Sequence, residues 1–169
     1  MIIEPIQLFL CGGTIDKKYF PEREVFDFEI THTNQMLNQS RISEEITFDI
    51  KCLFLKDSLD MTHEDRVRVS QACQQSPAEH ILIMHGTSTM VETANAIAEN
   101  IEHSKTVVLF GAMLPYELTQ SDALFNFGTA LSAVQISQPG IYIAMNGKIW
   151  KHNAVVKNEI VANFESREA

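Results

Sequence analysis

The chain has 169 residues, a length that suits one domain with its own hydrophobic core. Hydrophobic residues make up 45% of the chain and charged residues 21%, which is the composition of a globular protein rather than a disordered one. The net charge of -9 argues against nucleic acid as a main partner, because phosphate binding needs a basic surface.

Several other kinds of site and location are disfavoured by signals that the sequence lacks. No basic run and no apolar stretch of about 18 residues suggests a membrane, and the N-terminus does not resemble a signal peptide. The three cysteines, Cys11, Cys52 and Cys73, are scattered, which favours reduced thiols and a cytoplasmic location. The histidines show no metal-ligand spacing, and no dinucleotide or phosphate-loop motif is present, so we expect no metal and no cofactor.

The predicted elements alternate between strands and helices along the chain. The first part of the chain is predicted to form a strand at 5–11, a loop or short hairpin at 16–31, a helix at 34–41 and a strand at 46–55. A helix from the cap residue Thr62 to about 73 follows, then a strand at 80–84, a helix at 90–101, a strand at 106–110 and a helix at 123–134. The last predicted strand, at 140–145, turns at Asn146-Gly147 into a return strand at 148–150. The segment 152–169 receives no element. This alternation predicts a single α/β domain over 1–169, in three layers, with a mainly parallel sheet and helices on both faces.

Three of the predicted strands end in short loops that carry hydroxyl groups. These loops are Gly13-Thr14, Asp57-Ser58 and Gly86-Thr87-Ser88. Because the carboxyl ends of parallel strands meet at one edge of a sheet, we expect the three loops to lie together and to bind a small polar substrate. A hydroxyl nucleophile also needs a neighbouring base, for which the candidates are Lys157, Asp16, Asp57 and His85.

The motifs together resemble those of the bacterial-type L-asparaginases. Cys11-Gly12-Gly13-Thr14-Ile15 resembles the T-G-G-T-I motif of that family, and Asp57-Ser58-Leu59-Asp60-Met61 is similar to its substrate loop. Further matches follow in the family's order, namely His85-Gly86-Thr87-Ser88-Thr89-Met90, Gly111-Ala112-Met113-Leu114-Pro115, Ser121-Asp122 with Asn126, and the segment from Met145-Asn146 to Lys157. The resemblance implies an asparaginase N-terminal-domain-like fold.

The resemblance also implies a reaction, the hydrolysis of L-asparagine or a related small amide to the acid and ammonia. In that reaction Thr14 would be the nucleophile and would form an acyl-enzyme. Thr87 and Lys157 would form a second catalytic group, with Lys157 as base or proton relay. Threonine is inert without a base, so this division of roles agrees with elementary chemistry.

Substrate binding is implied by position as well. Asp57 and Ser58 would hold the α-carboxylate and α-amino groups of the substrate, together with the backbone of Thr87-Ser88. The backbone amide of Ala112 or of Thr87 would lie near the oxyanion. The family's site is completed across subunits, which implies a homo-oligomer.

The sequence departs from the family pattern at several positions. Ser88 stands where the family has an aspartate, so Lys157 loses a partner that favours its charged form, and the substrate amine loses an anionic contact. The place of the family's loop tyrosine is taken by Phe26 or Asp27, and Tyr19 is the nearest tyrosine. Cys11 replaces the first motif threonine, and we interpret it as a small buried residue. Family members are also commonly longer and carry a second domain.

Three functional hypotheses therefore stay open. The first is an asparaginase-type amidohydrolase. The second is a catalytically impaired amino-acid-binding or regulatory relative, suggested by Ser88 and Phe26. The third is an amidase whose substrate lacks a free α-amine. Structural roles are the alternative for individual residues, with His85 as a buried polar residue, Thr87 as a helix cap, Lys157 as a surface lysine, and Asp122 and Asn126 as helix-capping and packing residues.

Overall fold

The computed structural model describes residues 4–102 and 104–167. Its elements, in chain order, are β1 (Ile6–Gly12), the 3-10 turn η1 (Thr14–Asp16), β2 (Lys18–Phe20), β3 (Val25–Asp27), α1 (Thr33–Gln39), β4 (Phe48–Lys56), the 3-10 turn η2 (Ser58–Asp60), α2 (His63–Gln75), β5 (His80–Met84), α3 (Met90–Ala98), β6 (Thr106–Phe110), α4 (Ala123–Ile136), β7 (Gly140–Met145), β8 (Lys148–Lys151), β9 (Val155–Asn158) and β10 (Asn163–Ser166).

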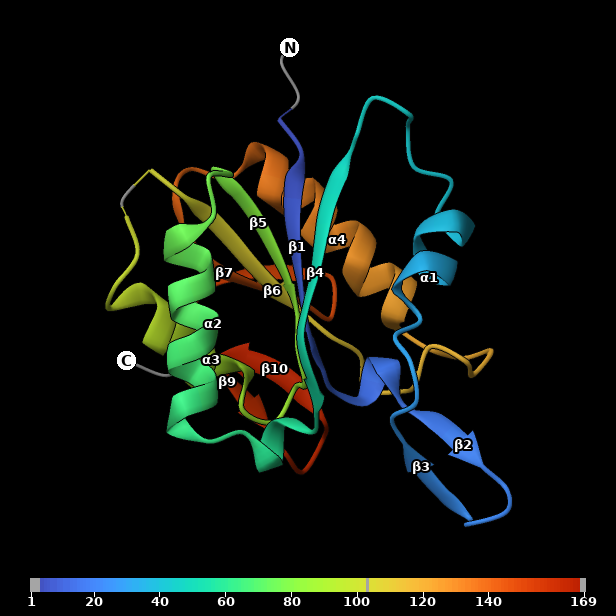
Figure 1. The fold of residues 1–169 in the computed structure, drawn as a ribbon. Coiled ribbons are helices and arrows are strands. Elements are labelled where there is room, and N and C mark those ends of the chain that lie inside the picture. The colour runs from blue at the N-terminus through green and yellow to red at the C-terminus, as the bar shows by residue number, and fades with distance from the viewer. Residues whose placement is uncertain (1–3, 103, 168–169) are drawn as a thin grey trace.

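Six of the strands form one sheet in the order β4-β1-β5-β6-β7-β8. The strands β4, β1, β5, β6 and β7 all run parallel to one another. Strand β8, at the edge, runs antiparallel to β7. In this register Leu8 of β1 lies opposite Ile50 on one side and Leu82 on the other. The predicted mainly parallel sheet is confirmed, and Figure 1 shows α2 in front of it and α4 behind it.

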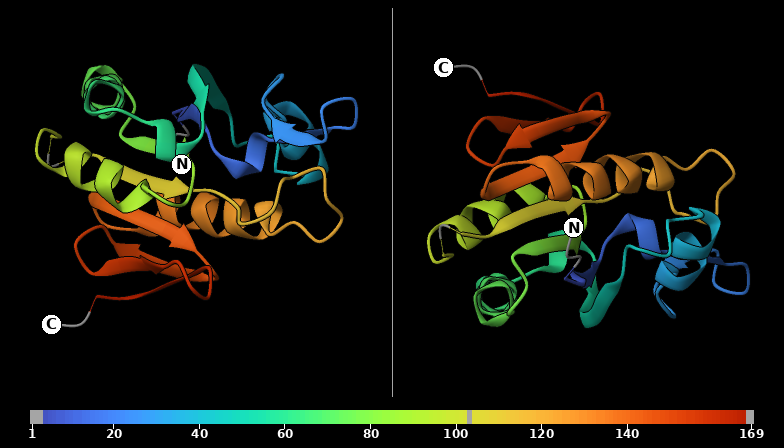
Figure 2. Two further views of the ribbon diagram at one scale, coloured as in Figure 1. Left: turned by 90° about the horizontal axis from the view of Figure 1, so that it is seen from below. Right: turned by 90° about the horizontal axis from the view of Figure 1, so that it is seen from above.

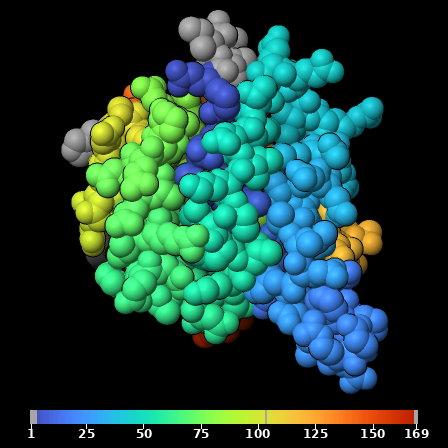
Figure 3. Space-filling view, viewed as in Figure 1, coloured from blue at the N-terminus to red at the C-terminus, as the bar shows by residue number. Residues whose placement is uncertain are grey.

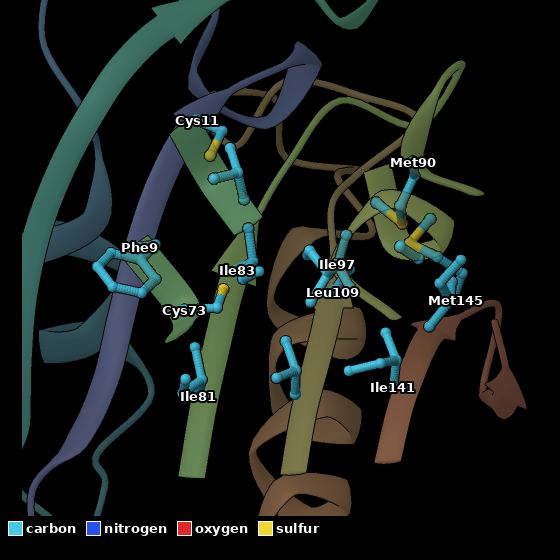
Figure 4. Close-up of a cluster of buried hydrophobic side chains, with 14 of the residues drawn as sticks. Phe9, Cys11, Cys73, Ile81, Ile83, Met90, Ile97, Leu109, Ile141 and Met145 are labelled. Carbon is cyan, nitrogen blue, oxygen red and sulfur yellow. The ribbon is translucent and has the colours of Figure 1, made fainter. Parts of the chain in front are cut away.

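Alternate residues of the strands fill two separate cores, because successive side chains of a strand point to opposite faces. Phe9, Ile83 and Leu109 belong to the core that α2 and α3 cover, part of which Figure 4 shows. Leu10 and Leu82 belong to the core beneath α1 and α4. Burial on both faces explains why these strands are almost continuously apolar. The three-layer α/β architecture predicted from the sequence is therefore confirmed. No helix among the described residues is long and apolar enough to cross a membrane.

Local signals in the sequence account for several element boundaries. Thr62 and Asp65 form a reciprocal capping box at the start of α2. Asn146 and Gly147 adopt φ angles of 55° and 74°, as a two-residue turn between β7 and β8 requires. The predicted strands at 80–84, 106–110 and 140–145 agree with β5, β6 and β7.

Other boundaries differ from the prediction. Helix α3 ends at Ala98 rather than at 101. The Asn100 N–H bonds to the carbonyl of Ile97, three residues back instead of four, so the α-helical pattern does not continue. The segment at 16–31 contains the hairpin of β2 and β3. The segment at 152–169, for which no element is predicted, contains the hairpin of β9 and β10, whose pairing joins Phe164 to Lys157.

The two small hairpins extend from different sides of the sheet. Figure 2 shows the β2–β3 hairpin beside α1, and the β9–β10 hairpin beside β7 and β8. In Figure 3 the β2–β3 hairpin projects from the body of the molecule at the lower right. These hairpins carry Tyr19, Phe26 and Lys157, which are candidate site residues.

The buried ammonium of Lys105 closes the carboxyl end of α2. Its Nζ donates hydrogen bonds to the carbonyl oxygens of Cys73 at 3.0 Å and Gln74 at 3.4 Å, and to that of Ser76. A cation at this end of a helix also interacts favourably with the helix dipole.

We predict that Lys105→Met lowers the free energy of unfolding by about 1–3 kcal/mol, because it leaves buried carbonyl groups without a donor. Urea unfolding followed by circular dichroism measures the change. Lys151→Met is the matched control, since Lys151 is exposed on β8. Equal stability of the two variants would contradict the capping role of Lys105.

Candidate active site

The candidate site lies where the connections of two neighbouring strands leave in opposite directions. After β1 the chain passes to α1 on one face of the sheet, and after β5 it passes to α3 on the other face. In parallel sheets this arrangement opens a crevice at the carboxyl ends of the two strands. Thr14 follows β1 and Thr87 follows β5, so both lie at this point.

Glycines allow the loops at this crevice to touch. Gly13 has a φ of 89°, and a Cβ atom there would overlap the backbone of Gly86. A Cβ atom on Gly86 would in turn lie 2.7 Å from the Oγ of Ser58. The loops after β1, β4 and β5 are thus in direct contact, as the sequence predicted.

The hydroxyl groups in these loops differ in how they are held. Thr89 donates from its Oγ1 to the Ser58 carbonyl at 2.7 Å, and its backbone N–H lies 3.4 Å from the Ser58 Oγ. Ser58 is therefore fastened to the start of α3. Within residues 4–102 and 104–167, neither the Thr14 nor the Thr87 hydroxyl forms a hydrogen bond with another group of the chain, so both remain available to a ligand.

Lys157 reaches the same region from β9. Its side chain is only 9% exposed, and its Nζ lies 3.1 Å from the Ser88 Oγ and 2.9 Å from the Glu159 Oε2. The sequence predicted that Lys157 loses an anionic partner because Ser88 is not an aspartate. Ser88 is indeed its neutral contact, and Glu159, which we did not predict, supplies a carboxylate. The Lys157 side chain is largely buried, which disagrees with the alternative of a solvated surface lysine.

Asp57 is held by two groups of the chain. Its Oδ1 accepts the backbone N–H of Leu59 at 3.0 Å, and its Oδ2 forms an ion pair with Lys17 Nζ. Burial acts to raise the pKa of this carboxyl, but the hydrogen bonds from Lys17 and Leu59 outweigh burial and hold the pKa below its usual range. A carboxylate with a lowered pKa is a weak base, so Asp57 is a poor candidate for taking the proton of a hydroxyl group.

Sequence reasoning missed Lys17 and Glu159, whose charged side chains complete the site. Glu159 lies two residues after Lys157, the spacing at which side chains of an extended segment share a face. That spacing was a usable signal. Lys17 follows the Thr14–Asp16 turn directly, but nothing in the sequence shows that it meets Asp57, which is 40 positions away.

Two other candidate bases have structural roles. The Asp16 Oδ1 accepts the His32 backbone N–H at 2.8 Å and the Thr31 hydroxyl at 3.1 Å, which ties η1 to the start of α1. Burial raises the pKa of Asp16. His85 is fully buried, with its Nδ1 2.7 Å from the Gly86 carbonyl and its Nε2 2.9 Å from the Thr93 hydroxyl. The structural interpretation of His85 is confirmed.

Tyr19 and Phe26 occupy opposite positions of the β2–β3 hairpin. They are cross-strand partners with ring centroids 5.2 Å apart, and each residue is 44% exposed. The resemblance placed Phe26 or Asp27 where the family has a tyrosine. Because Tyr19 lies directly beside Phe26, the hairpin still presents a phenol at nearly the same place.

Ala112 lies in the loop after β6 and is packed in the core beneath α4. The next residues, Met113 and Leu114, donate their backbone N–H groups to the Asp122 carboxylate at 2.9 and 3.1 Å. Asp122 therefore fixes this loop by accepting backbone N–H groups, whereas the N–H of Ala123 is accepted by the Ser121 Oγ.

A series of hydrogen bonds runs from this loop to the β9–β10 hairpin. The Asn126 Nδ2 donates to the Gly111 carbonyl at 3.0 Å, and its Oδ1 accepts the Asn146 N–H at 3.2 Å. The Asn146 Oδ1 accepts the N–H of Phe164 at 3.0 Å, and Phe164 pairs with Lys157 across the hairpin. The structural interpretation of Asn126 is confirmed, and the series positions the strand that carries Lys157.

We predict that His85 makes the folded state sensitive to acid. Burial lowers the pKa of His85 to about 4, whereas an unfolded histidine titrates near 6.5. The unfolded state therefore binds the proton first, so the stability is complete above pH ~6.5 and falls by about 3 kcal/mol as the pH drops to ~4. Urea unfolding across this range tests the slope. His85→Gln should flatten it and exposed His63→Gln should not; an unchanged slope in His85→Gln would refute the assignment.

We also predict that Gly13→Ala destabilises the protein by about 2 kcal/mol or more, because the added Cβ meets backbone and φ is positive. Gly128→Ala in α4 is the control. A Cβ atom there meets nothing within 4 Å, so the change should stabilise the helix by about 0.5–1 kcal/mol. Thermal unfolding compares the two. A neutral Gly13→Ala would show that the loops do not need this close contact.

Comparison with known proteins gives the same family as the motifs. Residues 5–168 match the family model described as Asparaginase, N-terminal. The L-asparaginase of Thermococcus kodakarensis is 38% identical over 104 residues, which cover 60% of this chain and 32% of that protein. The L-asparaginase of Dirofilaria immitis is 31% identical over 118 residues, which cover 66% of this chain and 20% of that one.

Solved structures agree with this assignment. The thermostable L-asparaginase from Thermococcus kodakarensis has a TM-score of 0.83 and 27% identity, covering 96% of this chain and 51% of that chain. L-asparaginase I from Vibrio cholerae shares the fold, with a TM-score of 0.82, 23% identity, and coverage of 98% and 52%. The chain thus spans about half the length of these solved relatives. It belongs to the asparaginase family, and residues 5–168 correspond to the N-terminal domain of that family.

Proposed function

We propose that this protein is an asparaginase-type amidohydrolase that converts L-asparagine, or a related small amide, to the acid and ammonia. The observation that carries the proposal is the contact of Gly13 with Gly86, which brings Thr14 beside the loops of Ser58 and Thr87 at the mouth of a parallel sheet. Membership of the asparaginase family supports the same reaction. So does the absence of a hydrogen bond on the Thr14 hydroxyl within the described part of the chain.

In the proposed reaction the Thr14 Oγ attacks the amide carbon. A C–O bond forms, the C–N bond breaks, and the nitrogen leaves as ammonia after it takes up the proton lost by the hydroxyl. Water then cleaves the resulting ester, which releases the acid and restores Thr14. Backbone N–H groups at Ala112 or Thr87 would stabilise the oxyanion, the usual role of such donors in acyl transfer.

Proton transfer is assigned to Thr87 and Lys157. The Lys157 Nζ contacts the Ser88 Oγ, and Ser88 is next to Thr87 in the chain, so the lysine of β9 lies against the loop that would face the substrate. Glu159 balances its charge.

Binding of the substrate is assigned to Asp57, Ser58 and Ser88, with Tyr19 and Phe26 of the β2–β3 hairpin as further contacts. We also propose that the protein acts as a homo-oligomer in the cytoplasm. Its three cysteines are free, with Cys11 and Cys73 buried, which is consistent with a reducing compartment. No cofactor or metal is required by this chemistry.

The direct test is release of ammonia from L-asparagine by the pure protein. We predict that Thr14→Ala lowers the rate by about a thousandfold or more, because the nucleophile is lost. Thr129→Ala is the matched control and should leave the rate unchanged, since Thr129 lies partly exposed on α4, where its hydroxyl donates to the Phe125 carbonyl. Equal rates for the wild type and Thr14→Ala with L-asparagine and also with succinamate, its analogue without the amine, would refute the proposal.

A second candidate function is suggested by Ser88 and Phe26, which replace groups that the family uses. On this hypothesis the protein binds an amino acid without turning it over. Calorimetry that shows binding of L-aspartate while no small amide is hydrolysed would favour it. Recovery of turnover in Ser88→Asp combined with Phe26→Tyr would then identify these two positions as the cause of the loss.

A further inference from the structure

The ion pair of Lys17 with Asp57 joins two of the loops that form the candidate site. Lys17 directly follows the η1 turn of Thr14, and Asp57 directly precedes Ser58. The two side chains are partly buried, with 22% of Lys17 and 26% of Asp57 exposed. The lysine therefore brings an ammonium group of the chain itself to the carboxylate beside the candidate nucleophile.

Both oxygens of Asp57 are occupied in this arrangement. One accepts the Leu59 N–H, and the other accepts the Lys17 ammonium. An amino-acid substrate would bring a second ammonium group, which needs a carboxylate or comparable acceptors when it leaves water. It would have to displace Lys17 from Asp57 or share the carboxylate with it, and two ammonium groups on one carboxylate repel each other. Because Lys17 belongs to the same chain, it competes at an effective concentration on the order of millimolar, whatever the concentration of the substrate.

The second part of the site is also balanced in charge. Lys157 pairs with Glu159, and its contact in the loop after β5 is the neutral side chain of Ser88. Within the described part of the chain, each of these two lysines is thus matched by one carboxylate, and a substrate cation would have to share that carboxylate with a lysine. An anionic substrate, by contrast, meets two ammonium groups that can each make a further hydrogen bond.

Resting on the amidohydrolase proposed above, we infer that the substrate is the monoamide of a dicarboxylic acid without a free ammonium group, and that Lys17 occupies the place of that group on Asp57. The carboxylate of such a substrate can bind near Lys17 and Lys157 while the internal ion pair stays intact. L-Asparagine carries the same carboxylate and amide, but its ammonium must compete with Lys17. Discrimination between the two substrates therefore depends on one side chain.

The test compares succinamate, which is asparagine without its amine, with L-asparagine as substrates of the wild type. The value of kcat/KM for succinamate should exceed that for L-asparagine by about tenfold or more. In Lys17→Met, which frees Asp57, the ratio should fall by a similar factor. Lys18→Met is the control, because it removes the same charge one residue away, where Lys18 pairs with Glu29 on the exposed hairpin. Its ratio should equal that of the wild type.

A wild type that prefers L-asparagine, or a ratio that is the same in Lys17→Met and the wild type, would overturn the inference. If Lys17→Met fails to fold, the wild-type ratio decides alone. If neither amide releases ammonia above the level of Thr14→Ala, the amidohydrolase is refuted, and binding decides the inference separately. Calorimetry should then show tighter binding of succinate than of L-aspartate to the wild type; the reverse order refutes it.

Discussion

The backbones of Gly13 and Gly86 meet where β1 and β5 end, and there is no room between them for a side chain. This contact fixes the spacing of the loops after the two strands, and Ser58 packs against Gly86 from a third side. The parallel register of β1, β4 and β5 is what brings these loops to one edge of the sheet. The position of Thr14 relative to Ser58 and Thr87 therefore depends on two residues that carry no functional group.

Charge is balanced within the site although the whole chain carries a net charge of -9. Lys17 and Lys157 are partly or largely buried, and each lies against a single carboxylate. Partly buried charges of this kind are screened less by salt than exposed ones, so the pairing of each group matters more here than the overall charge of the protein. A charged substrate group that enters the site must pair with a lysine or a carboxylate that already has a partner. The charge of that group therefore determines how well it binds.

Most of the fold could be predicted from the sequence because its strands are buried on both faces. In β5, Ile81, Leu82, Ile83 and Met84 form an unbroken apolar run, and such a run between helices has few other interpretations. The turn at Asn146-Gly147 was equally clear, since few residue pairs tolerate two positive φ angles. The β9–β10 hairpin was missed because Val155 and Phe164 are its only core residues, too few to give a period.

The site was predictable only in part. The motifs identified Thr14, Ser58 and Thr87, which follow three neighbouring strands at one edge of the sheet. They also identified Lys157, which reaches the same edge from β9. The partners of the charged groups were not predictable, because an ion pair such as Lys17 with Asp57 joins loops that are distant in the sequence. Pairing of that kind is decided by the packing of the whole sheet, and no local pattern encodes it.

The hydrogen bonds from Gly111 through Asn126 and Asn146 to Phe164 link the placement of Lys157 to α4. A hairpin with few core residues has little stability of its own, so β9 and β10 depend on contacts such as these hydrogen bonds for their order. The position of Lys157 is therefore coupled to α4, a helix that covers the opposite face of the sheet from the core that contains Val155 of β9.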